Sequence, residues 1–142
     1  MAIRAVTTIA AALLGLGHAG AAGAADKPAP DAAYAAYDQC MKTADDDNAA
    51  FDNCGGVLVT AEEARLNAAW QRIYPKLAPQ SKSALLAEER LWLAFKDSSC
   101  DYYKSGDYGR EGQTLSAPTC RADIIAARVD ELNGLYEQTE GR

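Results

Sequence analysis

Histidine is nearly absent from this 142-residue chain, whose one histidine is His18. His18 is therefore the only residue that could form a catalytic Ser–His or Cys–His pair or act as a histidine metal ligand. His18 also lies in a segment that we expect to be removed, so the mature chain would have no histidine. We accordingly expect no catalytic residue, no metal site and no cofactor, and we interpret the protein as a non-enzyme.

A hydrophobic run long enough to span a membrane is also missing. The apolar stretch at residues 5–16 has about a dozen residues, against roughly 20 for a spanning helix. It follows Arg4 and precedes a tract of small residues at 19–25, an order that is typical of a secretory signal peptide. We predict cleavage after Ala25, with Ala22 as second choice. A periplasmic or secreted location without stable membrane insertion follows.

Basic residues are too few to balance the acids, with 14 Lys and Arg against 20 Asp and Glu. Removal of residues 1–25 takes away Arg4 and no acid, which leaves 13 basic residues and a net charge of −7. Such a surface disfavours nucleic acid and anionic lipid as partners. It would attract a basic protein and speed its approach.

Cysteine is scarce, and no two of the four cysteines have the CxxC spacing. In an exported chain, four cysteines are typical of two disulfides, for which three pairings are possible. Free thiols or a metal site are the weaker alternatives. We predict Cys40–Cys54 and Cys100–Cys120, because each pair would join a helix end to the start of the following segment. An antiparallel turn there brings Cα atoms within about 4.4–6.8 Å.

No strand pattern and no internal repeat occurs, whereas apolar residues recur at helical three- and four-residue steps in four segments. After a flexible tail at 26–31, the predicted helices cover residues 32–42, 60–77, 81–103 and 116–138. The apolar stripes are Tyr34, Tyr37 and Met41; Leu66, Trp70, Ile73 and Leu77; Leu85, Leu86, Trp92, Leu93 and Cys100; and Ile125, Val129, Leu132 and Tyr136. These stripes predict an all-α, small four-helix bundle-like domain at 32–138, braced by two disulfides and organised around the third helix.

The segment between the first two helices is acidic. The run Asp45–Asn48 resembles part of a calcium loop but lacks its central glycine and closing glutamate, so we interpret 43–53 as a solvated connector. The pair Gly55-Gly56 predicts a turn. Thr60 and Glu63 then predict a capping box at the start of the second helix.

Glycines at 106, 109 and 112 predict a loop after the third helix, because glycine spaced in this way supports neither helix nor strand. A nucleotide-binding loop is not expected, since no strand precedes these glycines and GxGxxG is not matched.

The order of motifs along the mature chain resembles that of the LprI-like lysozyme-inhibitor domain family. The matching positions are Cys40, Cys54, Leu66-Asn67, Trp70, Leu77, Glu89–Leu93, Phe95–Asp97, Cys100, Cys120, Arg128 and Leu132. Two positions depart from the family pattern: Trp70 replaces an expected tyrosine, and Ile125 replaces a threonine. The resemblance implies an exported protein that binds and inhibits lysozyme.

The resemblance also implies a set of signature residues, namely Leu66, Asn67, Arg90, Trp92, Asp97 and Arg128. We interpret Trp92 as a core residue, because packing explains the aromatic stripe without a ligand. The charged residues are interpreted as caps of helices or bridges between them.

Inhibition would need a projecting group that enters a carboxylate-lined sugar cleft. We expect this group in the loop 104–116, because Cys100 and Cys120 would hold both of its ends. Tyr108 could stack as a sugar would, and Arg110 could reach the carboxylates. The candidate lysozyme-binding residues are Asp107, Tyr108, Arg110 and Glu111. The alternative for this loop is a plain solvent-exposed connector.

Two other functions compete with inhibition. A non-enzymatic periplasmic binding or structural module with another partner would use the same fold and cysteines. A glycoside hydrolase would need two converging carboxylates. The adjacent pairs Glu62-Glu63 and Glu88-Glu89 point about 100° apart on a helix, so they do not converge. We interpret them as solvated helix faces.

Overall fold

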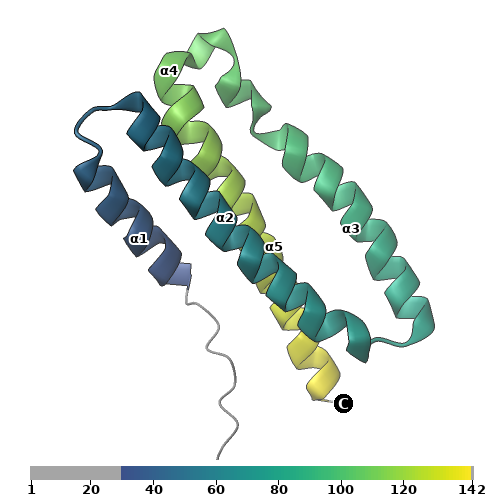
Figure 1. Ribbon diagram of the computed structural model, residues 1–142. Helices are drawn as coiled ribbons and strands as arrows, with labels where there is room; N and C mark the ends of the chain where they lie inside the picture. The colour runs from purple at the N-terminus through teal and green to yellow at the C-terminus, as the bar shows by residue number, and fades with distance from the viewer. Residues whose placement is uncertain (1–29, 142) are drawn as a thin grey trace, which may run out of the picture.

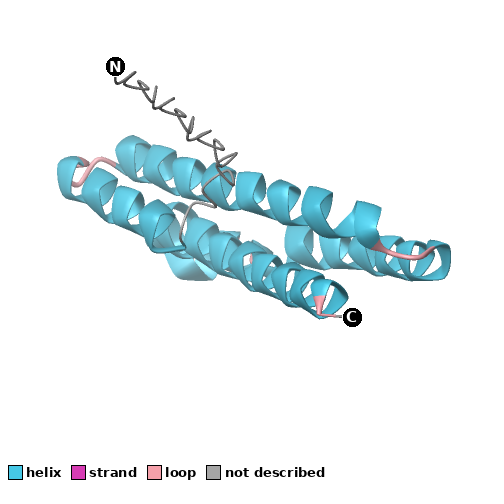
Figure 2. Cartoon of the chain, turned by 90° about the horizontal axis from the view of Figure 1, so that it is seen from below, coloured by secondary structure: helices cyan, strands magenta, loops and turns pink. Residues whose placement is uncertain are grey.

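Four long helices form nearly all of residues 30–141, the part of the chain that the computed structural model describes. They are α1 (Pro30–Thr43), α2 (Asn48–Ile73), α3 (Pro79–Ser99) and α5 (Ala117–Glu140). No strand occurs among these residues (Figure 2), and the predicted all-α class is confirmed. The predicted signal peptide at 1–25 and most of the tail at 26–31 lie outside the described residues.

Helices α2 and α5 lie side by side and run in the same direction (Figure 1). Residue numbers increase in the same direction along both helices. Gly55 lies against Pro118 near one end, and the Lys76 side chain, just after α2, donates to Glu140 near the other. The core cluster is Leu66, Ala69, Ile73, Leu85, Ile125, Val129 and Leu132, with Val59, Trp70, Leu77, Trp92 and Tyr136 at its edge. The apolar stripes predicted on these two helices are thus confirmed. Each fully buried aliphatic side chain contributes roughly 1.5–3 kcal/mol.

Helix α2 begins at Asn48 rather than at Thr60. The Asp47 side chain caps it by accepting a hydrogen bond from the Ala49 amide at 3.0 Å. Gly55 lies inside the helix, where an added Cβ would come within 2.6 Å of the Pro118 ring. The predicted turn at Gly55-Gly56 and the capping box at Thr60 are therefore wrong. The glycine serves a close approach of two helices, and the Thr60 hydroxyl donates to the Gly56 carbonyl in mid-helix.

The connection between α1 and α2 is shorter than predicted and occupies only residues 44–47. Asp45 and Asp46 adopt positive φ angles of 46° and 58°. Aspartate tolerates this left-handed conformation better than most residues, because its short polar side chain can bond locally. The tight turn is thus made by two of the acids that we interpreted as part of a longer connector.

Helix α1 is attached to α2 through its half-buried stripe Tyr34, Tyr37 and Met41 and through the Cys40–Cys54 disulfide. The Cα atoms of the two cysteines are 5.7 Å apart, within the usual range for a disulfide. The Tyr34 hydroxyl donates to Asp123 on α5. Burial raises the pKa of Tyr34, and the hydrogen bond to Asp123 raises it further.

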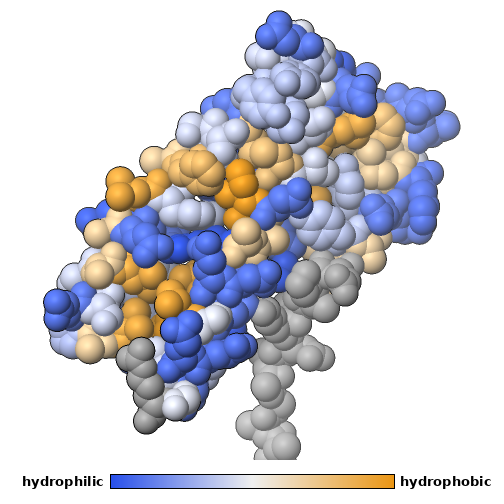
Figure 3. Space-filling model, turned by 180° about the vertical axis from the view of Figure 1, so that it is seen from behind, coloured by the Kyte–Doolittle hydropathy of each residue, from blue (hydrophilic) through white to orange (hydrophobic). Residues whose placement is uncertain are grey.

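The backbone of α3 lies farther from the α2–α5 pair than these two helices lie from each other (Figure 1). Leu85 is buried and Trp92 is half-buried, but Leu91, Leu93 and Phe95 are 75%, 41% and 55% exposed. Hydrophobic side chains gather accordingly on the flank that α3 forms (Figure 3). The fold is therefore not organised around the third helix, and Leu93 does not share its buried face.

No helix within residues 30–141 combines the length and the apolar composition that crossing a bilayer requires.

Candidate functional site

The Cys100–Cys120 disulfide closes one end of the molecule. Its Cα atoms are 6.0 Å apart, and it joins the end of α3 to the first turns of α5. Between the cysteines lies a segment of short turns, residues 101–116, which we call the end segment. It comprises η2 (Asp101–Lys104), η3 (Gly106–Tyr108), α4 (Gly109–Glu111) and the π-helical turn η4 (Gly112–Ser116). Both predicted disulfide pairings are thus present.

The end segment is more regular than the loop that its glycines predicted. Gly109 has a φ of +59°, which favours glycine. At Gly112 a Cβ would overlap the Cβ of Tyr108 and lie 2.5 Å from the carbonyl oxygen of Tyr103. The glycines therefore permit tight turns and a close fold-back of the chain, and helical turns continue through both positions.

The rings of three tyrosines of the end segment contact one another. The ring centroids of Tyr102 and Tyr103 are 4.1 Å apart, and Tyr108 meets these two rings edge-on at 5.1 and 5.2 Å. Tyr103 is half-buried, whereas Tyr102 and Tyr108 are 50% and 47% exposed. The side-chain hydrogen bond with Tyr103, followed by desolvation, raises the pKa of Tyr102 to about 12. We call these three residues the tyrosine cluster.

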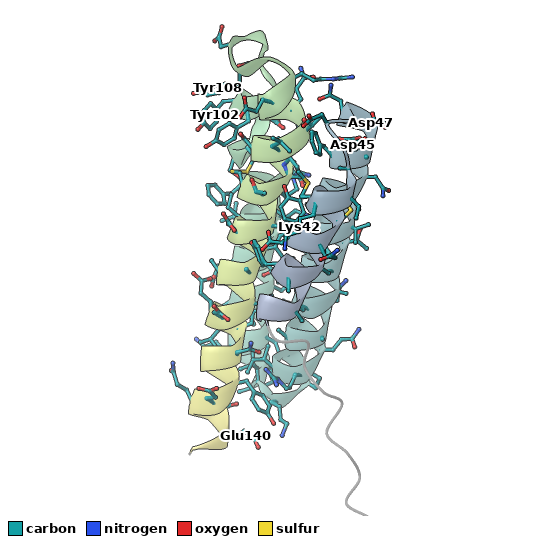
Figure 4. All side chains as sticks on the ribbon, turned by 90° about the vertical axis from the view of Figure 1, so that its left-hand side faces the viewer. Lys42, Asp45, Asp47, Tyr102, Tyr108 and Glu140 are labelled. Atoms are coloured by element: carbon teal, nitrogen blue, oxygen red, sulfur yellow. A yellow bond between two sulfur atoms is a disulfide. The ribbon has the colours of Figure 1, made fainter. Side chains whose placement is uncertain are left out.

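The tyrosine cluster lies at the end of the bundle opposite the carboxyl end of α5. Figure 4 shows Tyr102 and Tyr108 on one side of this end and Asp45 and Asp47 of the α1–α2 turn on the opposite side, while Glu140 lies at the other end. The three aspartates 45–47 are all exposed. This end of the molecule thus combines exposed aromatic surface with acidic charge.

The four residues predicted to bind lysozyme all lie in the end segment and are all exposed. Tyr108 belongs to the tyrosine cluster, and Asp107 and Glu111 flank it in the chain. The Arg110 guanidinium donates to the Gln113 side chain at 3.4 Å, and Gln113 donates to the Lys104 carbonyl at 3.4 Å. These bonds tie the arginine to the fold of its own segment.

The signature residue Arg128 is buried, 3% exposed, between α3 and α5. Its Nε and Nη2 donate to Glu89 at 3.0 and 2.9 Å, and its Nη1 donates to Glu88 at 2.7 Å and to Glu131 at 2.9 Å. Burial alone would lower its pKa, but the hydrogen bonds to these carboxylates outweigh burial and raise it. The guanidinium also lies 5.8 Å from the Trp92 ring. This group of charges therefore fastens α3 to α5.

The remaining signature residues lie in separate places. Leu66 is in the core, whereas Asn67 and Arg90 are exposed. Asp97 is 67% exposed at its side chain and lies 3.6 Å from Lys96 and 4.0 Å from Arg121. These residues do not converge on one surface with the tyrosine cluster.

The adjacent glutamates are all paired with basic side chains. Glu62 is fully buried and bonded to Arg65, while Glu63 points to Lys96 on α3 at 3.2 Å. The interpretation of both pairs as solvated helix faces is wrong, because Glu62 and Glu89 are buried against arginines. Within residues 30–141, no group of three or more His, Cys, Asp or Glu residues could hold a metal ion.

Sequence reasoning missed Tyr102 and Tyr103, which complete the tyrosine cluster. An adjacent pair of tyrosines directly after Asp101, next to a disulfide cysteine, was the available signal. Only Tyr108 was predicted, because Tyr102 and Tyr103 fall within the helix predicted at 81–103, whereas α3 ends at Ser99.

Comparison with protein families gives one informative match. The sequence model of the family described as "Lysozyme inhibitor LprI" matches residues 40–132. This range takes in both disulfides, the end segment and Arg128. No match is found among curated proteins or among solved structures.

Proposed function

This chain belongs to the LprI family, and on that premise we propose that it is an exported protein that binds and inhibits a lysozyme. The observation that carries the proposal is the family match over most of the described domain. Two disulfides fit an oxidising compartment outside the cytoplasm. The signal segment proposed at 1–25, with cleavage after Ala25, would take the chain there.

The charge of the protein suits a basic enzyme as partner. After cleavage the chain would have a net charge of −7. Opposite net charges accelerate encounter, and salt screens this attraction with a Debye length of about 10 Å at 0.1 M. The acids of the α1–α2 turn lie at the same end as the tyrosine cluster (Figure 4). Approach of a basic partner would therefore favour this end.

The end segment offers the contact surface. Tyrosine and arginine are frequent among the residues that carry binding energy. Tyr102 and Tyr108 are half-exposed but held by Tyr103 and by each other, so little side-chain freedom is lost on binding. One of these rings would stack in the sugar cleft, and Arg110 would bond a cleft carboxylate. Asp107 and Glu111 would face basic residues at the rim.

The test is lysozyme turnover on cell-wall substrate, at two salt concentrations and with lysozymes of different classes. We expect reversible inhibition that weakens at high salt. The variants Tyr108→Ala/Arg110→Ala and Tyr102→Ala/Tyr108→Ala should each lower the apparent affinity at least about a hundredfold, since each removes two central contacts. Helical content should not change, because alanine keeps the Cβ on which the turns pack.

The matched control is Asp130→Asn/Glu137→Gln, which removes two exposed acids of α5 far from the end segment. It should weaken inhibition only slightly and mostly at low salt. If it weakens inhibition more than the end-segment variants, the mechanism is one of overall charge. If inhibition survives loss of both tyrosines and Arg110, another surface binds the enzyme. If no lysozyme class is affected at micromolar excess, the protein is instead a non-enzymatic binding module with another partner.

A further inference from the structure

The outer face of α3 has a coiled-coil pattern that no part of the described chain covers. Ala84, Ala87, Leu91, Ala94 and Ser98 follow one another at steps of three, four, three and four residues, and all five are exposed. Alternating steps of three and four are the spacing of the contact positions in a coiled coil. We call these five residues the outer seam.

The outer seam is distinct from the face through which α3 joins the bundle. The inward face consists of Leu85, Glu89, Trp92 and Lys96, of which Glu89 is bonded to Arg128 and Lys96 to Glu63. The one hydroxyl of the outer seam, on Ser98, donates back to the Ala94 carbonyl of its own helix at 3.0 Å. The seam therefore offers an apolar surface to a second helix.

The charges beside the outer seam identify the occupant. Arg90 and Asp97 immediately precede Leu91 and Ser98, and they occupy the same edge position one heptad apart. When two such helices pair antiparallel, this edge of one helix faces the same edge of the other. With Leu91 opposite Ala94 of the second copy, Arg90 of each copy faces Asp97 of the other. Arg90 makes no ion pair among the described residues, and the Asp97 side chain is 67% exposed.

We propose that the outer seam pairs two copies of this chain antiparallel about the middle of α3. The self-complementary placement of Arg90 and Asp97 favours a second copy over an unrelated helix. Alanines at three of the five seam positions let the two helices approach closely. The apolar surface is small, however, so the dimer is weak and concentration-dependent, as expected for interfaces under about 1,200 Å².

The test is sedimentation of the purified full chain over a range of concentrations up to its solubility limit. Wild type should shift from monomer to dimer, and Leu91→Glu should remain monomeric with unchanged helical content. Arg90→Asp and Asp97→Arg should each weaken association at least about tenfold, because each creates two like-charge pairs in the dimer. An equal mixture of these two single variants should associate again, since every pair in the mixed dimer is then of opposite charge.

The mixing result separates antiparallel pairing from misfolding and from parallel pairing. Misfolded variants would not recover on mixing, and a parallel coiled coil would not bring Arg90 to Asp97. The proposal is overturned if wild type stays monomeric throughout or if the mixture associates no better than its components. It is also overturned if Leu91→Glu loses lysozyme inhibition while wild type is monomeric, because the seam would then be a lysozyme contact. Failure of lysozyme inhibition in all variants leaves the sedimentation result unaffected.

Discussion

Helices α2 and α5 are held together by apolar packing, whereas α3 is held by charge. Eight residues of α2 and seven of α5 are buried, and both sets contain fully shielded aliphatic side chains. Helix α3 buries only Leu85, Glu89 and Lys96. Its attachment rests on Arg128 with Glu88 and Glu89, on Lys96 with Glu63, and on the edge contact of Trp92.

The difference between these two regions has a consequence for stability. Apolar burial is non-directional, and its contribution to stability is spread over many atoms. Removing one partner of a buried ion pair, in contrast, leaves the other charge buried without compensation and destabilises the attachment strongly. Helix α3 is also tethered by the Cys100–Cys120 disulfide at only one end. We therefore expect α3 to open locally at lower free energy than the α2–α5 pair, as sparsely packed elements do.

The largest effect is expected in the α2–α5 pair. Ile125 is fully buried, so Ile125→Ala should lower the free energy of unfolding by about 4 kcal/mol through lost burial and the cavity left behind. The matched variant in α3 is Leu91→Ala, at a side chain that is 75% exposed, where we expect a change below about 0.5 kcal/mol. Urea melts followed by circular dichroism at low protein concentration compare them. Similar losses in both variants would contradict the placement of the core.

The ionic attachment of α3 should show the next largest effect. Arg128→Met keeps apolar volume but leaves Glu89 buried without its partner, so we expect a loss of about 3 kcal/mol. Amide hydrogen exchange should quicken in α3 and much less in α2 and α5. The control Arg90→Met, at an exposed arginine of α3, should change stability by less than about 0.5 kcal/mol.

A second substitution checks the cause of that loss. If the unpaired Glu89 carboxylate is responsible, Arg128→Met/Glu89→Leu should regain most of the stability, since a buried ion pair is often replaceable by apolar residues. No recovery in the double variant would mean that the packing of the arginine, rather than the charge left behind, dominates.

The smallest change in the free energy of unfolding is expected at Gly55, where α2 approaches α5 closely. Gly55→Ala places a Cβ against the Pro118 ring, so it should cost about 1–2 kcal/mol by overpacking. At the adjacent Gly56 an added Cβ meets nothing within 4 Å, and Gly56→Ala should stabilise by about 0.5–1 kcal/mol through helix propensity. Thermal melts of the two variants should shift in opposite directions. Equal shifts would mean that Gly55 is not required for the crossing.

The parts of the fold that were predicted from the sequence are those with a local signature. The stripes of Leu66 with Ile73 and of Ile125 with Leu132 follow the helical repeat and are buried as expected. The start of α2 was missed because the need for Gly55 comes from Pro118, which is distant in the sequence. The inward face of α3 was predicted only in part. Leu85 and Trp92 lie on it as expected, but Glu89 looks like a solvated residue until Arg128 is placed beside it.

In the candidate site, too, some features were predictable from the sequence and others were not. The disulfide that brackets the end segment and the exposure of Tyr108 and Arg110 were accessible from cysteine order and from the lack of an apolar pattern. The edge-on contact of Tyr108 with Tyr102 depends on the backbone path through Gly109 and Gly112. Such a path combines several short turns, and no simple repeat in the sequence specifies it.

The Cys100–Cys120 disulfide also changes what a protease can do to this protein. Lys104 and Arg110 are exposed between the two cysteines, and exposed turns are preferred sites of proteolytic nicking. A single cut after either residue would leave two fragments, one with α1 to α3 and one with α5, joined through the disulfide and packed on each other. The nicked molecule would gain only the mass of one water, and its fragments would stay joined until a reductant separates them. One cleavage in the end segment would therefore not release any helix.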